Sequence, residues 1–108
     1  MDAKNVTIII DLPIGSAHPL YPDLIYPINY GYIPGTMAAD DEPEDAYLLG
    51  VDVPVSAFTG HIIARIHRTD DIEDKWVVAP ERLSFTEDQI RKAVHFQEQF
   101  FHSTIHML

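Results

Sequence analysis

Two short runs of the sequence hold nine of its seventeen acidic residues. The first run is Asp40, Asp41, Glu42, Glu44 and Asp45, and the second is Asp70, Asp71, Glu73 and Asp74. Carboxylates packed this closely repel one another, and a hard divalent cation such as Mg²⁺, which prefers oxygen ligands, removes that repulsion. A solvated turn is the simpler interpretation of any single acidic run. Two such runs at the ends of neighbouring strands favour a metal site.

Short apolar segments predict the strands that position these runs. The segments are rich in β-branched and aromatic residues and are bounded by Gly and Pro, which is typical of β-strands. We expect strands at residues 5–12, 24–33, 46–53, 61–67 and 75–80. Pro27 makes the second an edge strand or a bent strand, and Asp11 lies at the end of the first. Five short strands predict a small, mainly β, closed barrel whose strand ends bring the carboxylates to one mouth.

From residue 86 the hydrophobic period changes to that of a helix. Thr86 and Gln89 fit a capping box at its start. We expect this C-terminal helix to continue to the last residue and to pack on the barrel. One face of such a helix would carry His95, Glu98, His102 and His106. The spacing of the last two would suit a transition metal, but a solvated face, or one that meets a neighbouring subunit, is the simpler interpretation.

Composition excludes several functional classes. A chain of 108 residues corresponds to a single domain, residues 1–108. Its formal net charge of −10 disfavours binding to nucleic acid and to anionic membranes. The absence of cysteine excludes disulfides and thiolate zinc sites. No apolar run approaches the roughly 18 residues that span a bilayer, and no signal peptide is visible, so we expect a cytoplasmic protein.

Residues 25–36, IYPINYGYIPGT, resemble the YPxNYGYI block of the soluble family I inorganic pyrophosphatases. The DDEPED segment that follows resembles the D-x-D-P-x-D signature of that family, in which Asp40, Pro43 and Asp45 match and Glu42 stands in place of an Asp. Two consecutive motifs at this spacing are a specific signal. Three further segments resemble parts of the same family in the same order, namely residues 9–13, 69–80 and 93–101.

The resemblance implies a five-stranded OB-like barrel, in agreement with the strand count. It implies hydrolysis of inorganic pyrophosphate to two phosphates by a metal-activated water, with Mg²⁺, or alternatively Mn²⁺, as cofactor. The metal ligands that it implies are Asp40, Asp45, Asp70 and either Glu73 or Asp74. Glu42 takes the position of the general base, and the residues implied around the phosphates are Tyr26, Tyr30, Lys75 and Asp11. The family also implies a homo-oligomer, either a trimer or a hexamer.

Cationic side chains for phosphate are scarce in this sequence. The family supplies Lys and Arg between its first strand and the YPxNY block, whereas residues 14–25 hold neither. The family's phosphate-binding Tyr–Lys pair corresponds here to Phe100 and Phe101. Arg65 and Arg68 are the nearest replacements, although surface arginines are the simpler interpretation. Two alternatives therefore stay open: a metal-dependent hydrolase of another, less highly charged phosphorylated small molecule, and a non-catalytic relative that binds metal or a protein partner.

Overall fold

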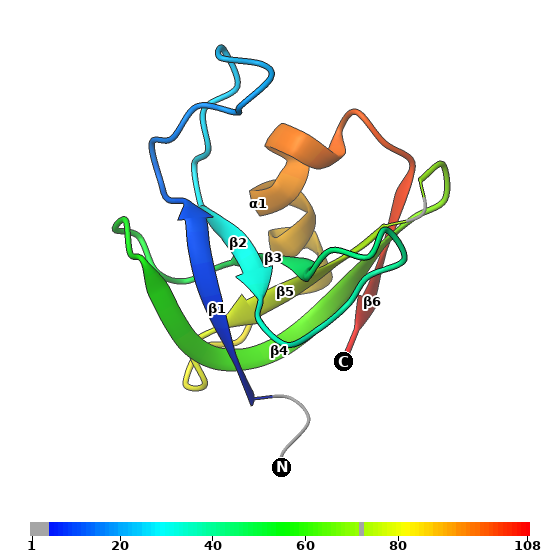
Figure 1. Ribbon diagram of the computed structural model, residues 1–108. Helices are drawn as coiled ribbons and strands as arrows, with labels where there is room; N and C mark the ends of the chain where they lie inside the picture. The colour runs from blue at the N-terminus through cyan, green and yellow to red at the C-terminus, as the bar shows by residue number, and fades with distance from the viewer. Residues whose placement is uncertain (1–4, 72) are drawn as a thin grey trace.

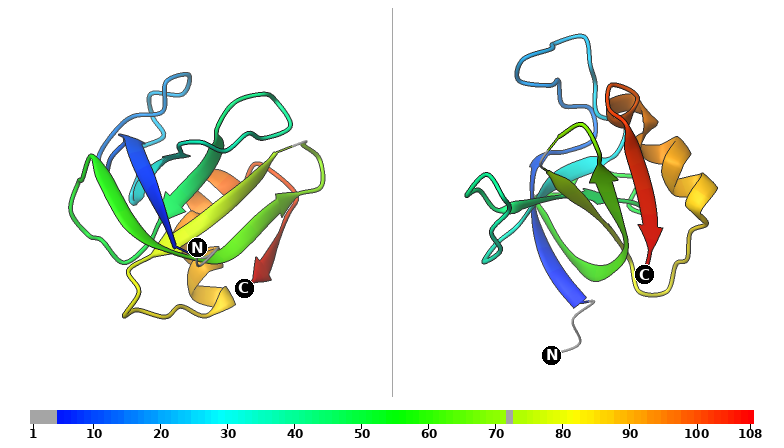
Figure 2. Two further views of the ribbon diagram at one scale, coloured as in Figure 1. Left: turned by 60° about the horizontal axis from the view of Figure 1, so that its bottom comes forward. Right: turned by 90° about the vertical axis from the view of Figure 1, so that its right-hand side faces the viewer.

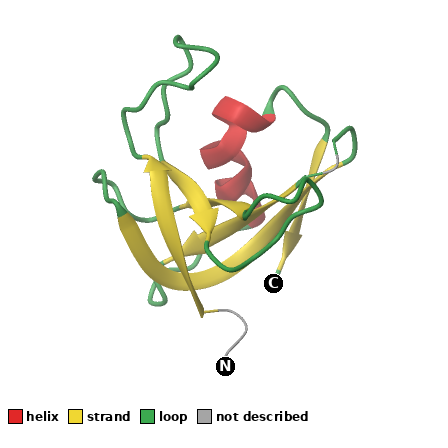
Figure 3. Cartoon of the chain, viewed as in Figure 1, coloured by secondary structure: helices red, strands yellow, loops and turns green. Residues whose placement is uncertain are grey.

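Six β-strands and one α-helix make up the computed structural model, which describes residues 5–71 and 73–108 (Figures 1 and 3). The elements in chain order are β1 (Asn5–Leu12), β2 (Asn29–Ile33), β3 (Glu44–Leu48), β4 (Ala57–Arg68), β5 (Asp74–Ala79), α1 (Glu87–Glu98) and β6 (Ser103–Met107). They form a mainly β, closed barrel with the helix packed on it, so the predicted fold class is confirmed.

The twelve-residue strand β4 closes the barrel. The strands are ordered β1-β2-β3-β5-β4, and β4 pairs back onto β1. One edge of β4 pairs with β5, whereas the other edge pairs first with β1 and then, from Ala64 to Arg68, with β6. Strand β4 curves so that it can pair with both β1 and β6 along this edge, as Figure 2 shows. Strands β3 and β5 are parallel and in a register that places Asp45 beside Lys75.

The helix is shorter than its sequence pattern predicts. The capping box is confirmed, because Thr86 Oγ1 accepts the N–H of Gln89 and the Gln89 side chain accepts the N–H of Thr86. However, α1 ends at Glu98, and β6 then pairs with the half of β4 whose backbone groups would otherwise lack partners. The predicted histidine face is therefore wrong, since His102 precedes β6 and His106 lies on it. Within residues 5–71 and 73–108, no helix combines the length and apolar character that crossing a bilayer requires.

The predicted strand bounds hold for β1 and shift by a few residues elsewhere. Strand β2 begins at Asn29 rather than at residue 24, because Pro27 has no N–H for a strand ladder. Strand β3 ends at Leu48 rather than at residue 53, since Gly50 turns the chain with a φ of +84°. Strand β4 is longer than predicted because partners pair with both of its ends.

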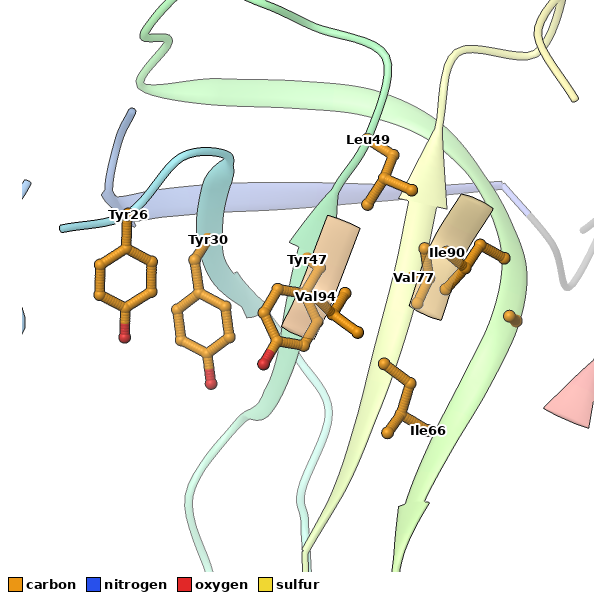
Figure 4. Close-up of a cluster of buried hydrophobic side chains, with 9 residues drawn as sticks. Tyr26, Tyr30, Tyr47, Leu49, Ile66, Val77, Ile90 and Val94 are labelled. Carbon is orange, nitrogen blue, oxygen red and sulfur yellow. The ribbon is translucent and has the colours of Figure 1, made fainter. Parts of the chain in front are cut away.

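Two groups of buried side chains fill the molecule. The first packs between strands and helix and contains Tyr26, Tyr30, Tyr47, Leu49, Ala64, Ile66, Val77, Ile90 and Val94 (Figure 4). The second comes from strands alone and contains Ile8, Ile10, Ile33, Ala46, Leu48 and Val78. Successive strand residues such as Tyr47 and Leu48 separate into different groups because they point to opposite faces. The hydroxyls of the three tyrosines in the first group point in one direction (Figure 4).

Asn29, the first residue of β2, connects two loops to the barrel. Its side chain is fully buried; Oδ1 accepts the N–H of Ile14 at 3.1 Å, and Nδ2 donates to the carbonyls of Val51 at 3.2 Å and Val53 at 3.0 Å. These bonds satisfy backbone groups where strand pairing ends. The asparagine of the YPxNYGYI block is therefore a structural residue that holds the start of the loop between β1 and β2.

Replacing Asn29 with alanine should lower the free energy of unfolding by about 2–3 kcal/mol, because one backbone N–H and two carbonyls lose their buried partner. Urea unfolding monitored by circular dichroism measures the change. Thr7→Val is the control, since it removes an exposed 2.7 Å hydroxyl bond to Thr59 and should change stability by about 0.5 kcal/mol or less. Equal losses in the two variants would show that Asn29 does not hold the loops.

Candidate active site

The ammonium group of Lys75 lies at the centre of a group of acidic and phenolic side chains. Lys75 is on β5 and is 3% exposed. Its Nζ lies 2.5 Å from Oδ2 of Asp45 and 2.6 Å from Oε2 of Glu73, and 6.0 Å from the ring centre of Tyr30 on β2. A buried ammonium is stable only where carboxylates neutralise it. The parallel register of β3 and β5 thus joins one residue of each acidic run to the same cation.

Two tyrosines and Asp11 lie beside this group. Burial, followed by the charges of Asp11 and Asp45, raises the pKa of Tyr26 to about 12. Burial, followed by the charge of Asp45, raises the pKa of Tyr30 well above its ordinary value. The pKa of Asp11 is also raised, chiefly by burial and further by Asp45, against an opposing backbone hydrogen bond. Both phenols therefore stay protonated at neutral pH and serve as hydrogen-bond donors.

Asp40 and Glu73 share a hydrogen bond between their carboxyl groups. That bond lowers the pKa of Asp40 and raises the pKa of Glu73, although the hydrogen bond from Lys75 opposes the rise. When one proton is bound to this pair, Glu73 therefore holds it in preference to Asp40. Two carboxyl groups held this close are also two oxygen donors that a divalent cation binds in place of the proton.

The carboxylates of the site fit the metal that the sequence implies, Mg²⁺, in one specific form. In the described part of the chain, no three acidic or histidine side chains are arranged around one metal position. Mg²⁺ in proteins is often held by one or two carboxylates, with water and substrate phosphates completing its six ligands. Asp40 and Glu73 supply two such carboxylates, and Asp45 is linked to Glu73 through Lys75. The residues fit Mg²⁺ in this two-carboxylate form.

A second buried cation, Arg68, lies at the end of β4. It is 4% exposed, its Nε and Nη2 donate to the two oxygens of Glu98 at 3.1 and 2.7 Å, and its guanidinium lies 3.7 Å from the ring centre of Phe101. Burial disfavours the charge of Glu98, but hydrogen bonds from Arg68 and Tyr47 outweigh burial and hold the pKa of Glu98 below its ordinary value. The interpretation of Arg68 as a surface arginine is therefore wrong.

A chain of hydrogen bonds through the end of α1 connects Tyr26, which lies beside the Lys75 group, to Arg68. Tyr26 donates to Gln97 at 2.5 Å, Gln97 donates to the hydroxyl of Tyr47 at 2.8 Å, and Tyr47 donates to Glu98, the partner of Arg68, at 2.6 Å. Sequence reasoning did not find this network, because its members are far apart in the chain. The one local signal is Gln97, a polar residue within an apolar helical stripe.

Three predicted site residues make contacts other than with Lys75. Asp74 directly precedes Lys75 on β5, so its side chain points to the opposite face of the strand. There it pairs with Arg65 at 2.9 Å and with His67 at 2.7 Å. Asp70 is exposed and accepts the N–H of His102 at 3.1 Å. Glu42 is exposed, and its N–H donates to Oδ1 of Asp40 at 3.1 Å. Of the two alternatives in the second run, it is therefore Glu73, and not Asp74, that contacts Lys75.

A cavity of about 1010 Å³ opens beside Lys75. The polar side chains that line it include Tyr26, Tyr30, Arg68, Glu73, Lys75 and Gln97, and the loop at residues 18–24 adds His18 and Asp23. The facing walls come from the loop at residues 18–24 and from Phe100 and Phe101, which follow α1. Figure 1 shows this loop and the C-terminal end of α1 at the same end of the molecule. Both buried cations and two of the buried phenols thus line one cavity.

Comparison with known proteins identifies relatives. The family model described as inorganic pyrophosphatase matches residues 13–106. The inorganic pyrophosphatase of Saccharolobus solfataricus is 30% identical over 96 residues, which cover 72% of this chain and 56% of that protein. The inorganic pyrophosphatase of Gluconobacter oxydans is 31% identical over 75 residues, which cover 56% of this chain and 42% of that protein. The chain therefore spans about half the length of the curated relatives it matches.

A solved structure shares the fold. The crystal structure of inorganic pyrophosphatase from Ehrlichia chaffeensis superposes with a TM-score of 0.74, at 19% sequence identity, over 94% of this chain and 83% of that one. At this identity the likeness concerns the barrel and the helix, and it agrees with the fold class predicted from the sequence.

The Arg68–Glu98 pair predicts a specific pH dependence of stability. The pKa of Glu98 is lower in the folded state than its ordinary value of 4.5, so its ionisation contributes stability that is complete above about pH 4.5 and is lost as pH falls through the folded pKa. Wild type should therefore lose more stability than Glu98→Gln between about pH 6 and pH 3.

Urea unfolding at a series of pH values measures this difference. Glu87→Gln is the matched control, because Glu87 pairs with Arg91 at 2.6 Å on the exposed face of α1, where an ion pair contributes little. It should keep the wild-type pH dependence. Parallel curves for wild type and Glu98→Gln would contradict the assignment of Glu98 as a carboxylate stabilised by Arg68.

Proposed function

Because the chain belongs to the inorganic pyrophosphatase family, we propose that it hydrolyses a phosphoanhydride bond and splits inorganic pyrophosphate into two phosphates. The observation that carries the proposal is the buried ammonium of Lys75, held between Asp45 and Glu73 on the wall of a cavity that Tyr26 and Tyr30 also line. A cation and two phenolic donors beside clustered carboxylates are the groups that positioning a phosphate and activating water require.

Lys75 and the two phenols bind the phosphate in this proposal. An ammonium group has three N–H donors, and Asp45 and Glu73 accept two of them, so the third is available to a phosphate oxygen. Tyr26 and Tyr30 keep their protons because their pKa values are raised. Without substrate the O–H of Tyr26 is donated to Gln97 and that of Tyr30 is bonded to Asp45, so in this proposal each hydroxyl turns to a phosphate oxygen when substrate binds. These contacts orient the phosphate against the carboxylates and stabilise the charge that spreads over its oxygens as the bond breaks.

Glu42 is the proposed general base. It lies in the exposed loop that carries Asp40, and it corresponds to the carboxylate at the base position of the D-x-D-P-x-D signature. In this role it accepts the proton of the attacking water, a contribution of roughly 10²–10⁴-fold. Asp11 and Asp41 are the next carboxylates for this role.

We propose Mg²⁺, with Mn²⁺ as the alternative, as the cofactor, held by Asp40 and Glu73 and assisted by Asp45. When bound, the metal lowers the pKa of water and neutralises the charge of the phosphates. Glu73 is preferred to Asp74 because Asp74 is paired with Arg65 and His67. Asp70 stays a further candidate ligand, since the backbone hydrogen bond that it accepts from the segment before β6 uses Oδ1 alone.

We also propose, as the family implies, that the chain forms a cytoplasmic homo-oligomer, a trimer or a hexamer, that acts on a small phosphorylated substrate. Met107, the last residue of the edge strand β6, and Leu108, which follows it, support association between copies, because both are apolar and exposed.

Glu73→Gln and Lys75→Ala should each lower kcat/KM for pyrophosphate by at least about 100-fold, whereas Asp74→Asn should lower it by less than about threefold. Release of inorganic phosphate at saturating Mg²⁺ measures these values, and circular dichroism confirms folding of each variant. A larger loss in Asp74→Asn than in Glu73→Gln would reverse the assignment of the carboxylate. Absence of phosphate release from pyrophosphate by wild type would contradict the proposed function.

Divalent metal should stabilise the fold. A ligand that binds the native state alone adds about 2.7 kcal/mol at a concentration of 100 times its Kd, so Mg²⁺ should raise the Tm relative to EDTA. The rise should be lost in Asp40→Asn, which removes one oxygen donor. KCl at matched ionic strength is the control for screening of the net charge of −10. An equal Tm in Mg²⁺, KCl and EDTA would show that the carboxylates do not form a metal site.

A further inference from the structure

The cavity beside Lys75 is much larger than pyrophosphate requires. Its volume of about 1010 Å³ matches the upper end of the roughly 300–1,000 Å³ typical of pockets that hold drug-sized molecules. The phosphate-binding groups proposed above occupy one side of it. The remaining lining is predominantly apolar, and it includes Leu20, Tyr21 and Leu24 from one segment and Phe100 and Phe101 from another.

The apolar loop is held in place by its own hydrogen bonds. Nδ1 of His18 accepts the N–H groups of Leu20 at 3.0 Å and Tyr21 at 3.3 Å, and the N–H of His18 donates to the carbonyl of Leu24 at 2.8 Å. The His18 ring also stacks on Tyr26, with 6.3 Å between ring centres. The loop is thereby anchored to a residue of the proposed phosphate site, and it presents its apolar side chains in a defined place.

Both walls expose large apolar side chains to solvent. Leu20 is 76% exposed, Tyr21 64% and Phe100 67%, although each lines the cavity. Apolar side chains gathered at the rim of a polar site mark a surface that a ligand covers. Their position on two sides of one cavity provides a place for an organic group between them.

The charges in the cavity favour a substrate that binds through an apolar group as well as through its phosphates. Arg68 and Lys75 are the only Lys or Arg side chains among the described residues that line it. Each is already paired, Lys75 with Asp45 and Glu73, and Arg68 with Glu98. These cations therefore leave little net positive charge to attract a bare diphosphate, and apolar contacts supply the missing binding energy.

We infer that the preferred substrate is an organic diphosphate, with its diphosphate beside Lys75 and an apolar or aromatic organic group between the loop at residues 18–24 and Phe100. This inference rests on the proposed function, because it uses the same phosphate site and the same reaction. Water attacks the terminal phosphorus, and the bond from that phosphorus to the bridging oxygen breaks. The proton of the water passes to a carboxylate of the site, and the products are inorganic phosphate and the organic monophosphate.

Hexyl diphosphate and methyl diphosphate form a matched pair of probes, since they carry the same charge and differ by five methylenes. Each methylene that is fully buried contributes about fourfold to binding. We expect kcat/KM with Mg²⁺ to be at least about tenfold higher for hexyl diphosphate than for methyl diphosphate, and higher than for pyrophosphate. Calorimetry of the same probes gives Kd values that do not depend on turnover.

Variants at the rim of the cavity distinguish binding of the hexyl group in this cavity from nonspecific hydrophobic binding. Leu20→Ser and Phe100→Ser should each reduce the hexyl-to-methyl ratio by at least about threefold. Val53→Ser is the control, because Val53 is 59% exposed and lies outside the cavity, and it should keep the wild-type ratio. An equal reduction in all three variants would overturn the inference.

The outcomes distinguish this inference from the proposed function. Tighter binding of hexyl diphosphate without hydrolysis of any probe would support the apolar pocket and contradict the proposed function. Hydrolysis of pyrophosphate with equal kcat/KM and equal Kd for hexyl and methyl diphosphate would support the proposed function and overturn the inference. Faster turnover of pyrophosphate than of hexyl diphosphate at equal concentrations below KM would also overturn it.

Discussion

A lysine that is buried within a barrel stays charged only if carboxylates take the place of water around it. In this protein that lysine is Lys75, and its two partners come from the two acidic runs of the chain. The lysine thus relieves part of the repulsion that would drive those runs apart. It also requires β3 and β5 to keep the parallel register that sets Asp45 beside it. The fold and the candidate site therefore depend on the same ion pairs.

The helix contributes to the site through its last turn. Gln97 and Glu98 join Tyr26 and Tyr47 to Arg68, so the end of α1 is connected to the cavity by buried hydrogen bonds. Buried polar groups require partners, and here each group supplies one to the next. The chain then leaves the helix immediately, and Phe101 covers the Arg68 guanidinium. This arrangement explains why polar side chains occupy a helical face that otherwise packs on the core.

Features carried by local patterns were predictable from the sequence. A short run of β-branched residues located β1 to the residue, and Thr86 with Gln89 located the start of α1. The family motifs indicated Tyr26, Tyr30 and Asp45 as site residues, and the structure brings them together.

Features that depend on residues far apart in the chain were not predictable. The end of α1 depends on the free edge of β4, and the burial of Arg68 depends on Glu98, thirty residues away. The choice between Glu73 and Asp74 likewise required the strand register, since one points toward Lys75 and the other toward Arg65. The central claim is that Lys75 is the phosphate-binding cation, and ³¹P NMR titration with imidodiphosphate, whose bridging nitrogen resists hydrolysis, tests it most directly. In the presence of Mg²⁺ the account predicts saturable shifts of the phosphorus resonances with wild type and their loss with folded Lys75→Gln. Equal binding by both proteins would contradict it.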